Sequence, residues 1–262
     1  MNNQPQPKPK SGAPLIIIGA AALIIILVAF FYLQSSKTPA VNSTGQNTAP
    51  TPKVSAIPPN APVGAQPPNM KGSPNAVVTI EEFADFQCPT CAQVYTVMNQ
   101  VHSEYGSRIK FIYRNYPLTQ IHKNSYDASV AAEAAFLQDQ NKFWDMQNQL
   151  FTNQTAWSNL PDPRPTFKGY AEKIGLDIAK WENDVAGLLA KNRVNADMDR
   201  GKALNISGTP TIYINGQQLE FKQFNFQAIK QIVDAELAKA PAQNTAPAPA
   251  QLAKPASANS NK

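Results

Sequence analysis

The stretch that decides the fold is Phe86-Gln87-Cys88-Pro89-Thr90-Cys91, which holds both cysteines of the 262-residue chain. It lies where a run of β-forming residues gives way to a helical pattern. Pro89 suits the first helical position, where a missing N–H costs nothing, so Cys88 is predicted to cap that helix. Unpaired N–H groups and the positive end of the helix dipole favour a thiolate there. Cys91 follows on the same face, close enough for a disulfide, so the pair is predicted to be a reversible dithiol.

Two other uses of such a pair are less favoured. A structural disulfide usually closes a longer loop, because cross-linking four residues removes little entropy from the unfolded chain. A metal site needs about four ligands, and the only histidines, His102 and His122, do not stand at metal-ligand spacing from the cysteines. We therefore expect neither a metal nor a cofactor.

The formal net charge of +5 does not belong to the middle of the chain. All 18 acidic residues lie between Glu81 and Glu236, whereas 16 of the 23 basic residues lie between Arg108 and Lys239. The excess comes from lysines in the two flanks. A core that binds nucleic acid is therefore excluded.

The N-terminal third is predicted to place the chain at a membrane. Residues 1–14 carry two lysines and no acids, and residues 15–33 are uncharged and mostly aliphatic. A helix over 15–33 spans about 30 Å, the thickness of the hydrocarbon layer. The preceding lysines favour a cytoplasmic N-terminus and an exported remainder. A cleavable signal peptide is the alternative, but its apolar region is typically only about 7–15 residues long.

Two segments lack the large apolar side chains that a core needs. Residues 34–74 are rich in Pro, Ala, Asn, Ser and Thr, and residues 240–262 have the same composition. Such segments cannot bury enough surface to offset their ordering entropy. We expect a disordered tether and a disordered tail on either side of a folded domain over 75–239.

The folded domain is predicted to begin with a strand, a helix and a second strand. The alternation over residues 76–86 places Glu82 on the more apolar face, where burial should raise the pKa of its carboxyl. An apolar stripe from Val94 to Tyr105 marks the helix, and Ile109 to Tyr113 forms a central strand. This order predicts a βαβ unit with a right-handed crossover. The competing role for Glu82 is an exposed side chain on an edge strand.

The rest of the domain is predicted to be helical and then to return to the sheet. Residues from about 122 to 205 carry helical patterns. Ser207-Gly208-Thr209-Pro210-Thr211 leads into a strand over 211–214, and Asn215-Gly216 signals a hairpin whose second strand runs over 217–221. A last amphipathic helix covers 226–237.

These features together resemble the DsbA-like branch of the thioredoxin superfamily. They are the Cys-Pro-Thr-Cys helix start, an acid six positions earlier, the helical insertion, Gly-Thr-Pro-Thr and the final hairpin and helix. The resemblance covers residues 75–239 and implies an α/β thioredoxin fold with a helical insertion at about 122–205, preceded here by one transmembrane helix.

The resemblance also implies roles for individual residues. Cys88 would be the nucleophile and Cys91 the resolving thiol. Glu82, from its own place on the strand that leads to Cys88, could exchange protons with the resolving thiol. Pro210 matches the family's cis-proline, and Thr209, preceded by Gly208, would pair with the backbone of a client. Pro89 and Thr90 stand where well-studied relatives have a histidine. We therefore expect a weaker oxidant, shifted by tens of millivolts.

The function that these residues predict is a monomeric, single-pass membrane oxidoreductase that donates disulfides to exported proteins. A membrane redox partner would reoxidise it. A reductase or isomerase of the same fold is the first alternative. A tethered chaperone or interaction module with a structural pair is the second, and a metal-handling protein is the third.

Overall fold

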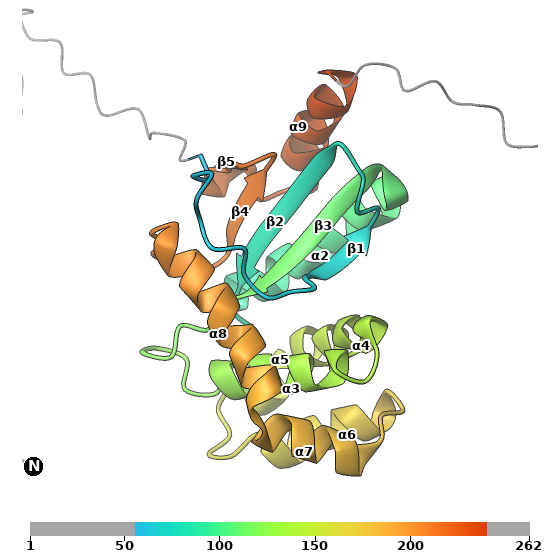
Figure 1. The fold of residues 1–262 in the computed structure, drawn as a ribbon, viewed down its shortest axis with the longest axis vertical. Helices are drawn as coiled ribbons and strands as arrows, with labels where there is room; N and C mark the ends of the chain where they lie inside the picture. Colours follow the sequence, from blue (N-terminus) through green and yellow to red (C-terminus); the bar gives the residue numbers. More distant parts are fainter. Residues whose placement is uncertain (1–55, 240–262) are drawn as a thin grey trace, which may run out of the picture. The chain divides into compact units, whose positions relative to one another are not determined.

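The computed structural model describes residues 56–239, whose path is shown in Figure 1. The predicted cytoplasmic N-terminus at 1–14, the membrane anchor at 15–33 and the tail at 240–262 lie outside these residues. Within 56–239, no helix has the length and apolar character that a membrane crossing requires.

One mixed sheet organises the domain. Its five strands stand in the order β1-β3-β2-β4-β5. Strands β2 and β3 are parallel, and the other pairs are antiparallel. The strands are β1 (Asn69–Gly72), β2 (Val78–Ala84), β3 (Ile109–Asn115), β4 (Thr211–Ile214) and β5 (Gln217–Gln218).

The centre of the sheet is the predicted βαβ unit. Helix α2 (Pro89–Tyr105) connects β2 to β3, and Gly106 ends it at a φ of 51° that residues with a side chain rarely adopt. Both central strands are buried on their two faces, and the charged side chains Glu81, Glu82 and Arg114 are buried with them. The parallel register places Glu82 of β2 beside Tyr113 of β3.

Helices α2 and α9 (Phe226–Lys239) cover one face of the sheet. Apolar side chains that alternate along the strands pack against the apolar stripes of these two helices, as in Val78 and Ile80 against Val94 and Ile229. The predicted last helix is thereby confirmed. The second hairpin strand is shorter than the predicted 217–221, because Glu220 and Gln223 cap a 3₁₀ turn that begins at Phe221.

The predicted helical insertion is also confirmed. Figure 1 shows its helices gathered beyond one end of the sheet, with α8 leading back toward β4. Aspartates cap two of them: Asp139 accepts a hydrogen bond from the Asn141 amide, and Asp177 from the Lys180 amide. The helices are α3 (Ser125–Phe136), α4 (Gln140–Thr152), α5 (Gln154–Trp157), α6 (Arg164–Lys173), α7 (Ile178–Ala186) and α8 (Leu188–Ala203).

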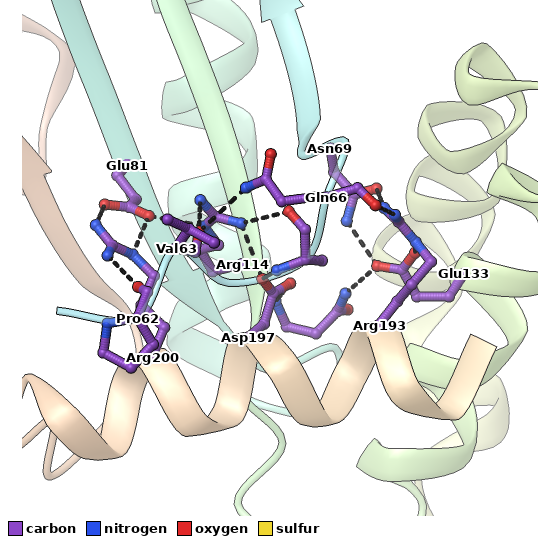
Figure 2. A network of polar contacts seen from close by, with 12 residues as sticks. Pro62, Val63, Gln66, Asn69, Glu81, Arg114, Glu133, Arg193, Asp197 and Arg200 are labelled. Carbon is purple, nitrogen blue, oxygen red and sulfur yellow. Dashed lines mark hydrogen bonds and ion pairs between the residues drawn. The ribbon is translucent and has the colours of Figure 1, made fainter. Parts of the chain in front are cut away.

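The predicted start of the domain at residue 75 is wrong, because residues 56–74 belong to the fold. Strand β1 adds to the sheet edge beside β3, and the segment before it is fixed by hydrogen bonds to its backbone (Figure 2). Arg114 donates to the carbonyls of Val63 and Ala65 at 2.8 and 3.2 Å, and Asp197 accepts from the Ala65 amide at 2.8 Å. Buried charged side chains order this part of the predicted tether, and Ile57 and Ala61 add apolar contacts to the core.

The charged groups in this region form one connected network (Figure 2). Arg114 pairs with Glu81 at 2.7 Å and with Asp197 at 3.0 Å. Arg193 of α8 pairs with Glu133 of α3 at 2.5 Å. The network joins the sheet, the helical insertion and the segment before β1, so the three parts are held in one arrangement.

Candidate active site

The two cysteines lie at the start of α2, at the end of the sheet that faces the helical insertion. Cys88 is the residue before the first turn and has an extended backbone, and Pro89 occupies the first turn as predicted. Cys88 is 7% exposed, whereas Cys91 is fully buried. Both are free thiols, so the structure shows the reduced pair.

The surroundings of the two thiols shift their pKa values in opposite directions. A hydrogen bond from Cys91 lowers the pKa of Cys88 to about 6, helped by backbone N–H groups of Cys91 and Thr90 and by Thr209. Burial raises the pKa of the Cys91 thiol, and the neighbouring Cys88 charge raises it further. At neutral pH Cys88 is therefore a thiolate and Cys91 a thiol, as the predicted roles of nucleophile and resolving thiol require. Thr90 contributes through its backbone N–H.

The loop before β4 lies directly against Cys88. The Thr209–Pro210 peptide bond is cis, in agreement with the expectation for Pro210. The Cys88 sulfur lies 3.4 Å from the Thr209 carbonyl oxygen, to which it can donate only when it is protonated. The Gly208 carbonyl accepts a hydrogen bond from the Thr211 hydroxyl at 2.8 Å, which fixes the turn into β4. The loop therefore borders the space that the backbone of a client would enter to reach Cys88. Its contact with clients stays a prediction.

Glu82 is buried, as the strand pattern predicts. Its side chain is on the face of β2 covered by α2, and the residue is 2% exposed. Burial raises the pKa of this carboxyl to about 8, and the negative charge of Cys88 adds to the rise. A carboxyl of this kind carries a proton at neutral pH and can release it within the ordinary range of protein titrations.

Asp85 and His122 belong to the site, although the sequence analysis assigned neither of them. The Asp85 carboxylate is fully buried and lies 2.8 Å from Nδ1 of His122. It also accepts the backbone N–H groups of Gln87 at 2.7 Å and Leu118 at 2.8 Å. The Asp85 N–H in turn faces the Cys91 sulfur at 3.5 Å. The acid directly after the strand was a usable signal for this cluster, whereas His122, 37 positions away, offered none.

The helical insertion also binds the segment around Cys88. The Gln154 side chain donates to the carbonyls of Phe86 and Cys88 at 2.7 and 2.9 Å. The Gln87 side chain donates to the Ser158 carbonyl at 2.8 Å and accepts from the Asn124 amide at 2.8 Å. These contacts fix the approach to α2 from the side opposite the cis-proline loop.

Other features of the described residues lie away from the thiols. A cavity of about 530 Å³ lies between α3, α6 and α7 and is lined only by residues of the helical insertion, among them Phe167 and Trp181. Over residues 56–239 no group of three or more His, Cys, Asp or Glu side chains is arranged to hold a metal ion.

The family assignment follows from comparison with known proteins. A family model described as thioredoxin matches residues 65–235. The chain belongs to the thioredoxin family. The matched range begins before residue 75, in agreement with the position of β1.

Among solved structures, oxidised BdbD from Bacillus subtilis is similar to this chain. Its TM-score is 0.59 at 24% identity, over 68% of this chain and 98% of that one. A probable disulfide bond formation protein D from Bacillus cereus is 29% identical over 175 residues, covering 64% of this chain and 78% of that protein. The predicted DsbA-like relationship is confirmed.

Other curated relatives are much longer proteins. The Na(+)/H(+) antiporter NhaA 1 of Mycolicibacterium gilvum is 32% identical over 161 residues, which are 60% of this chain. The chain spans 25% of the length of that protein. The similarity therefore concerns a part of the antiporter chain.

Proposed function

We propose that this protein is a membrane-anchored, extracytoplasmic oxidoreductase that donates its Cys88–Cys91 disulfide to exported proteins. The observation that carries the proposal is the asymmetry of the two thiols. Cys88 is partly accessible with a lowered pKa of about 6, while Cys91 is buried with a raised pKa. A dithiol arranged in this way takes up a client at one sulfur and keeps the other for the internal exchange.

The geometry supports a balanced exchange in two steps. A client thiolate attacks the Cys88 sulfur of the oxidised pair, and the electron pair of the broken S–S bond goes to Cys91. The Cys91 sulfur then takes up a proton, for which the neutral Glu82 carboxyl is the neighbouring source. A second client thiolate attacks the client sulfur of the mixed disulfide, and Cys88 leaves as a stabilised thiolate. The client gains one disulfide and the enzyme gains two electrons.

The direction of exchange depends on how well the reduced form is stabilised. Thioredoxin has a cysteine pKa of about 7 and a reduction potential of about −270 mV. DsbA has a cysteine pKa of about 3.5 and a reduction potential of about −120 mV. The value of about 6 for Cys88 lies between them. We therefore expect a potential between those of thioredoxin and DsbA. Such a protein can donate disulfides in an oxidising compartment, more weakly than the relatives with histidine.

The described part of the chain begins at the end of the sheet that lies away from the thiols. Ala56 pairs with Gln217, and the Ile57 N–H donates to Gly216, so the chain joins the fold at the β4–β5 turn. This turn is at the opposite end of β4 from the Thr209–Pro210 loop. The proposed partners are exported clients and a membrane redox protein.

The experiment measures the reduction potential of the protein together with two activities. The full chain is equilibrated with glutathione redox buffers, and its oxidation of a reduced secreted protein and its reduction of insulin are measured beside a Cys88→Ser variant. We expect a potential well above that of thioredoxin and loss of both activities in the variant. A potential at the thioredoxin level would reject donation in favour of reduction. Activities unchanged by Cys88→Ser would reject the redox function altogether.

The proposed anchor has its own test. Membranes from cells that produce the full chain, or a chain lacking residues 15–33, are extracted with alkaline carbonate, and the intact membranes are treated with protease on the outer side. The full chain should resist extraction and lose its domain to external protease. Extraction of both chains alike would contradict the anchor.

A further inference from the structure

Tyr113 is a buried side chain beside Glu82 whose hydroxyl no structural contact explains. It stands directly opposite Glu82 in the parallel β2–β3 register, and paired residues of neighbouring strands point to the same face. Both side chains therefore lie under α2, the helix that carries the cysteines. Tyr113 is fully buried.

The ring of Tyr113 is held firmly. It stacks on Phe86 with ring centroids 5.3 Å apart and packs against Phe143 at 5.5 Å. Its hydroxyl, however, has no hydrogen-bond partner among the described residues. A buried hydroxyl without a partner destabilises a fold, and a phenylalanine would fill the same space without that loss. The hydroxyl therefore has no role in packing.

The groups whose charges shift the pKa of the Tyr113 hydroxyl are all acids. Burial raises the pKa of Tyr113, and the charges of Glu82, Cys91, Asp85 and Cys88 raise it further, so the phenol stays protonated. Around Glu82 itself, the start of α2 contributes the two thiols, and the neighbouring β4 places the apolar Ile212 opposite it. No cation is among the groups that shift the pKa of Glu82. The Tyr113 O–H, which has no partner among the described residues and stands opposite Glu82 in the register, is therefore a neutral donor available to the carboxylate that forms when Glu82 gives up its proton.

We infer that Tyr113 is a positioning residue for proton transfer, its hydroxyl donating a hydrogen bond to the ionised Glu82 carboxylate directly or through one water. This inference rests on the proposed thiol–disulfide exchange. When Cys91 leaves as a thiolate and takes the proton of Glu82, the new carboxylate is stabilised by the phenol. When Cys91 attacks a mixed disulfide, the same carboxylate accepts the Cys91 proton. The S–S bond to Cys88 forms and the client sulfur leaves with the electron pair.

The test isolates the step in which Cys91 acts. The reduced full chain is mixed with an aromatic disulfide that releases a coloured thiol. The attack of Cys88 releases the first equivalent, and the attack of Cys91 on the mixed disulfide releases the second. The rate of the second release is measured against pH in wild type, Tyr113→Phe, Glu82→Gln and the double variant. Tyr105→Phe is the matched control, because its hydroxyl donates to Asp234 at 2.7 Å at the other end of α2.

In wild type the second release should rise with pH to a midpoint at or below about 8, since Cys88 carries no charge in the mixed disulfide. Tyr113→Phe removes the donor to the anion, so the midpoint should move up by about one unit and the rate below it should fall by up to about tenfold. Tyr105→Phe should keep the wild-type profile. In the Glu82→Gln background, Tyr113→Phe should have no further effect.

Each outcome bears on a separate claim. Failure of the first release in wild type would reject the exchange function itself. A normal first release with an unshifted second profile in Tyr113→Phe would overturn only the role of Tyr113. A shift that persists in the Glu82→Gln background would also overturn it, because the hydroxyl would then act by another route. Thermal unfolding of Tyr113→Phe should show no loss of stability, which keeps a folding defect apart from the pH effect.

Discussion

The hydrogen bond from Cys91 is the largest contribution that lowers the pKa of Cys88, so removing it should be measurable in isolation. In Cys91→Ala the donor is lost, whereas in Cys91→Ser a hydroxyl replaces the thiol as donor. Both variants leave Cys88 as the only cysteine of the chain. The absorbance of the thiolate therefore reports on Cys88 alone.

The size of the expected change follows from the strength of one hydrogen bond to a charged group. Such a bond contributes about 1.5–3 kcal/mol, and one pKa unit corresponds to about 1.4 kcal/mol. Cys91→Ala should raise the pKa of Cys88 by about one to two units from its value of about 6. It should stay below the ordinary cysteine value of about 8.5, because the backbone N–H groups at the start of α2 remain.

The assay is a pH titration of thiolate absorbance for the two variants, with urea-unfolded protein as the reference. Cys91→Ser should titrate within about one unit of the wild-type value, since it keeps a donor. A Cys88 pKa that stays near 6 in Cys91→Ala would show that the helix start alone sets it. Equal values in the two variants, both well above 6, would show that the hydrogen bond is not the cause.

Two further predictions concern stability. The pKa of Glu82 is raised from 4.5 to about 8 in the fold, so the folded state binds its proton more tightly and loses stability as pH rises through this window. In urea unfolding, Glu82→Gln should therefore be more stable than wild type by on the order of 3 kcal/mol near pH 7. The gain in stability should vanish toward pH 4.5. A gain that does not depend on pH would contradict this cause. Arg193→Met should cost about 3–5 kcal/mol because it leaves Glu133 buried and unpaired. The exposed Arg164→Met is its control and should unfold like wild type in the same assay.

The sequence was a sufficient guide wherever one local pattern determined one element. The Cys-Pro-Thr-Cys stretch marked the junction of β2 and α2, and alternation along the strand placed Glu82 in the interior. Asn215 and Gly216 both have positive φ, which asparagine tolerates and glycine adopts freely because it has no side chain. The hairpin was therefore predictable from two residues. The helical insertion followed from its periodic apolar positions.

The sequence was a poor guide where order depends on distant charged groups. Residues 56–68 have the composition of a tether, and their carbonyls are fixed by arginines up to 138 positions away. The approach of His122 to Asp85 depends on how the loop after β3 returns to the end of β2. Neither arrangement leaves a periodic or spaced signal. Partners of this kind become visible only once the sheet has brought the segments together.

The way in which the Cys88 thiolate is stabilised has a consequence for its working range. A histidine between the cysteines would stabilise the thiolate most when the imidazole is charged, so its effect would fall as pH rises through its own titration. Here the stabilising groups are backbone N–H groups of α2 and the Cys91 thiol, whose pKa is raised by burial. None of them loses its proton near neutral pH. The thiolate should therefore remain stabilised until Cys88 itself is protonated, at about pH 6. Above that point reduction of the disulfide takes up one proton, at Cys91, and the potential should change by about 30 mV per pH unit; below it a second proton is taken up at Cys88 and the change should rise to about 59 mV per unit.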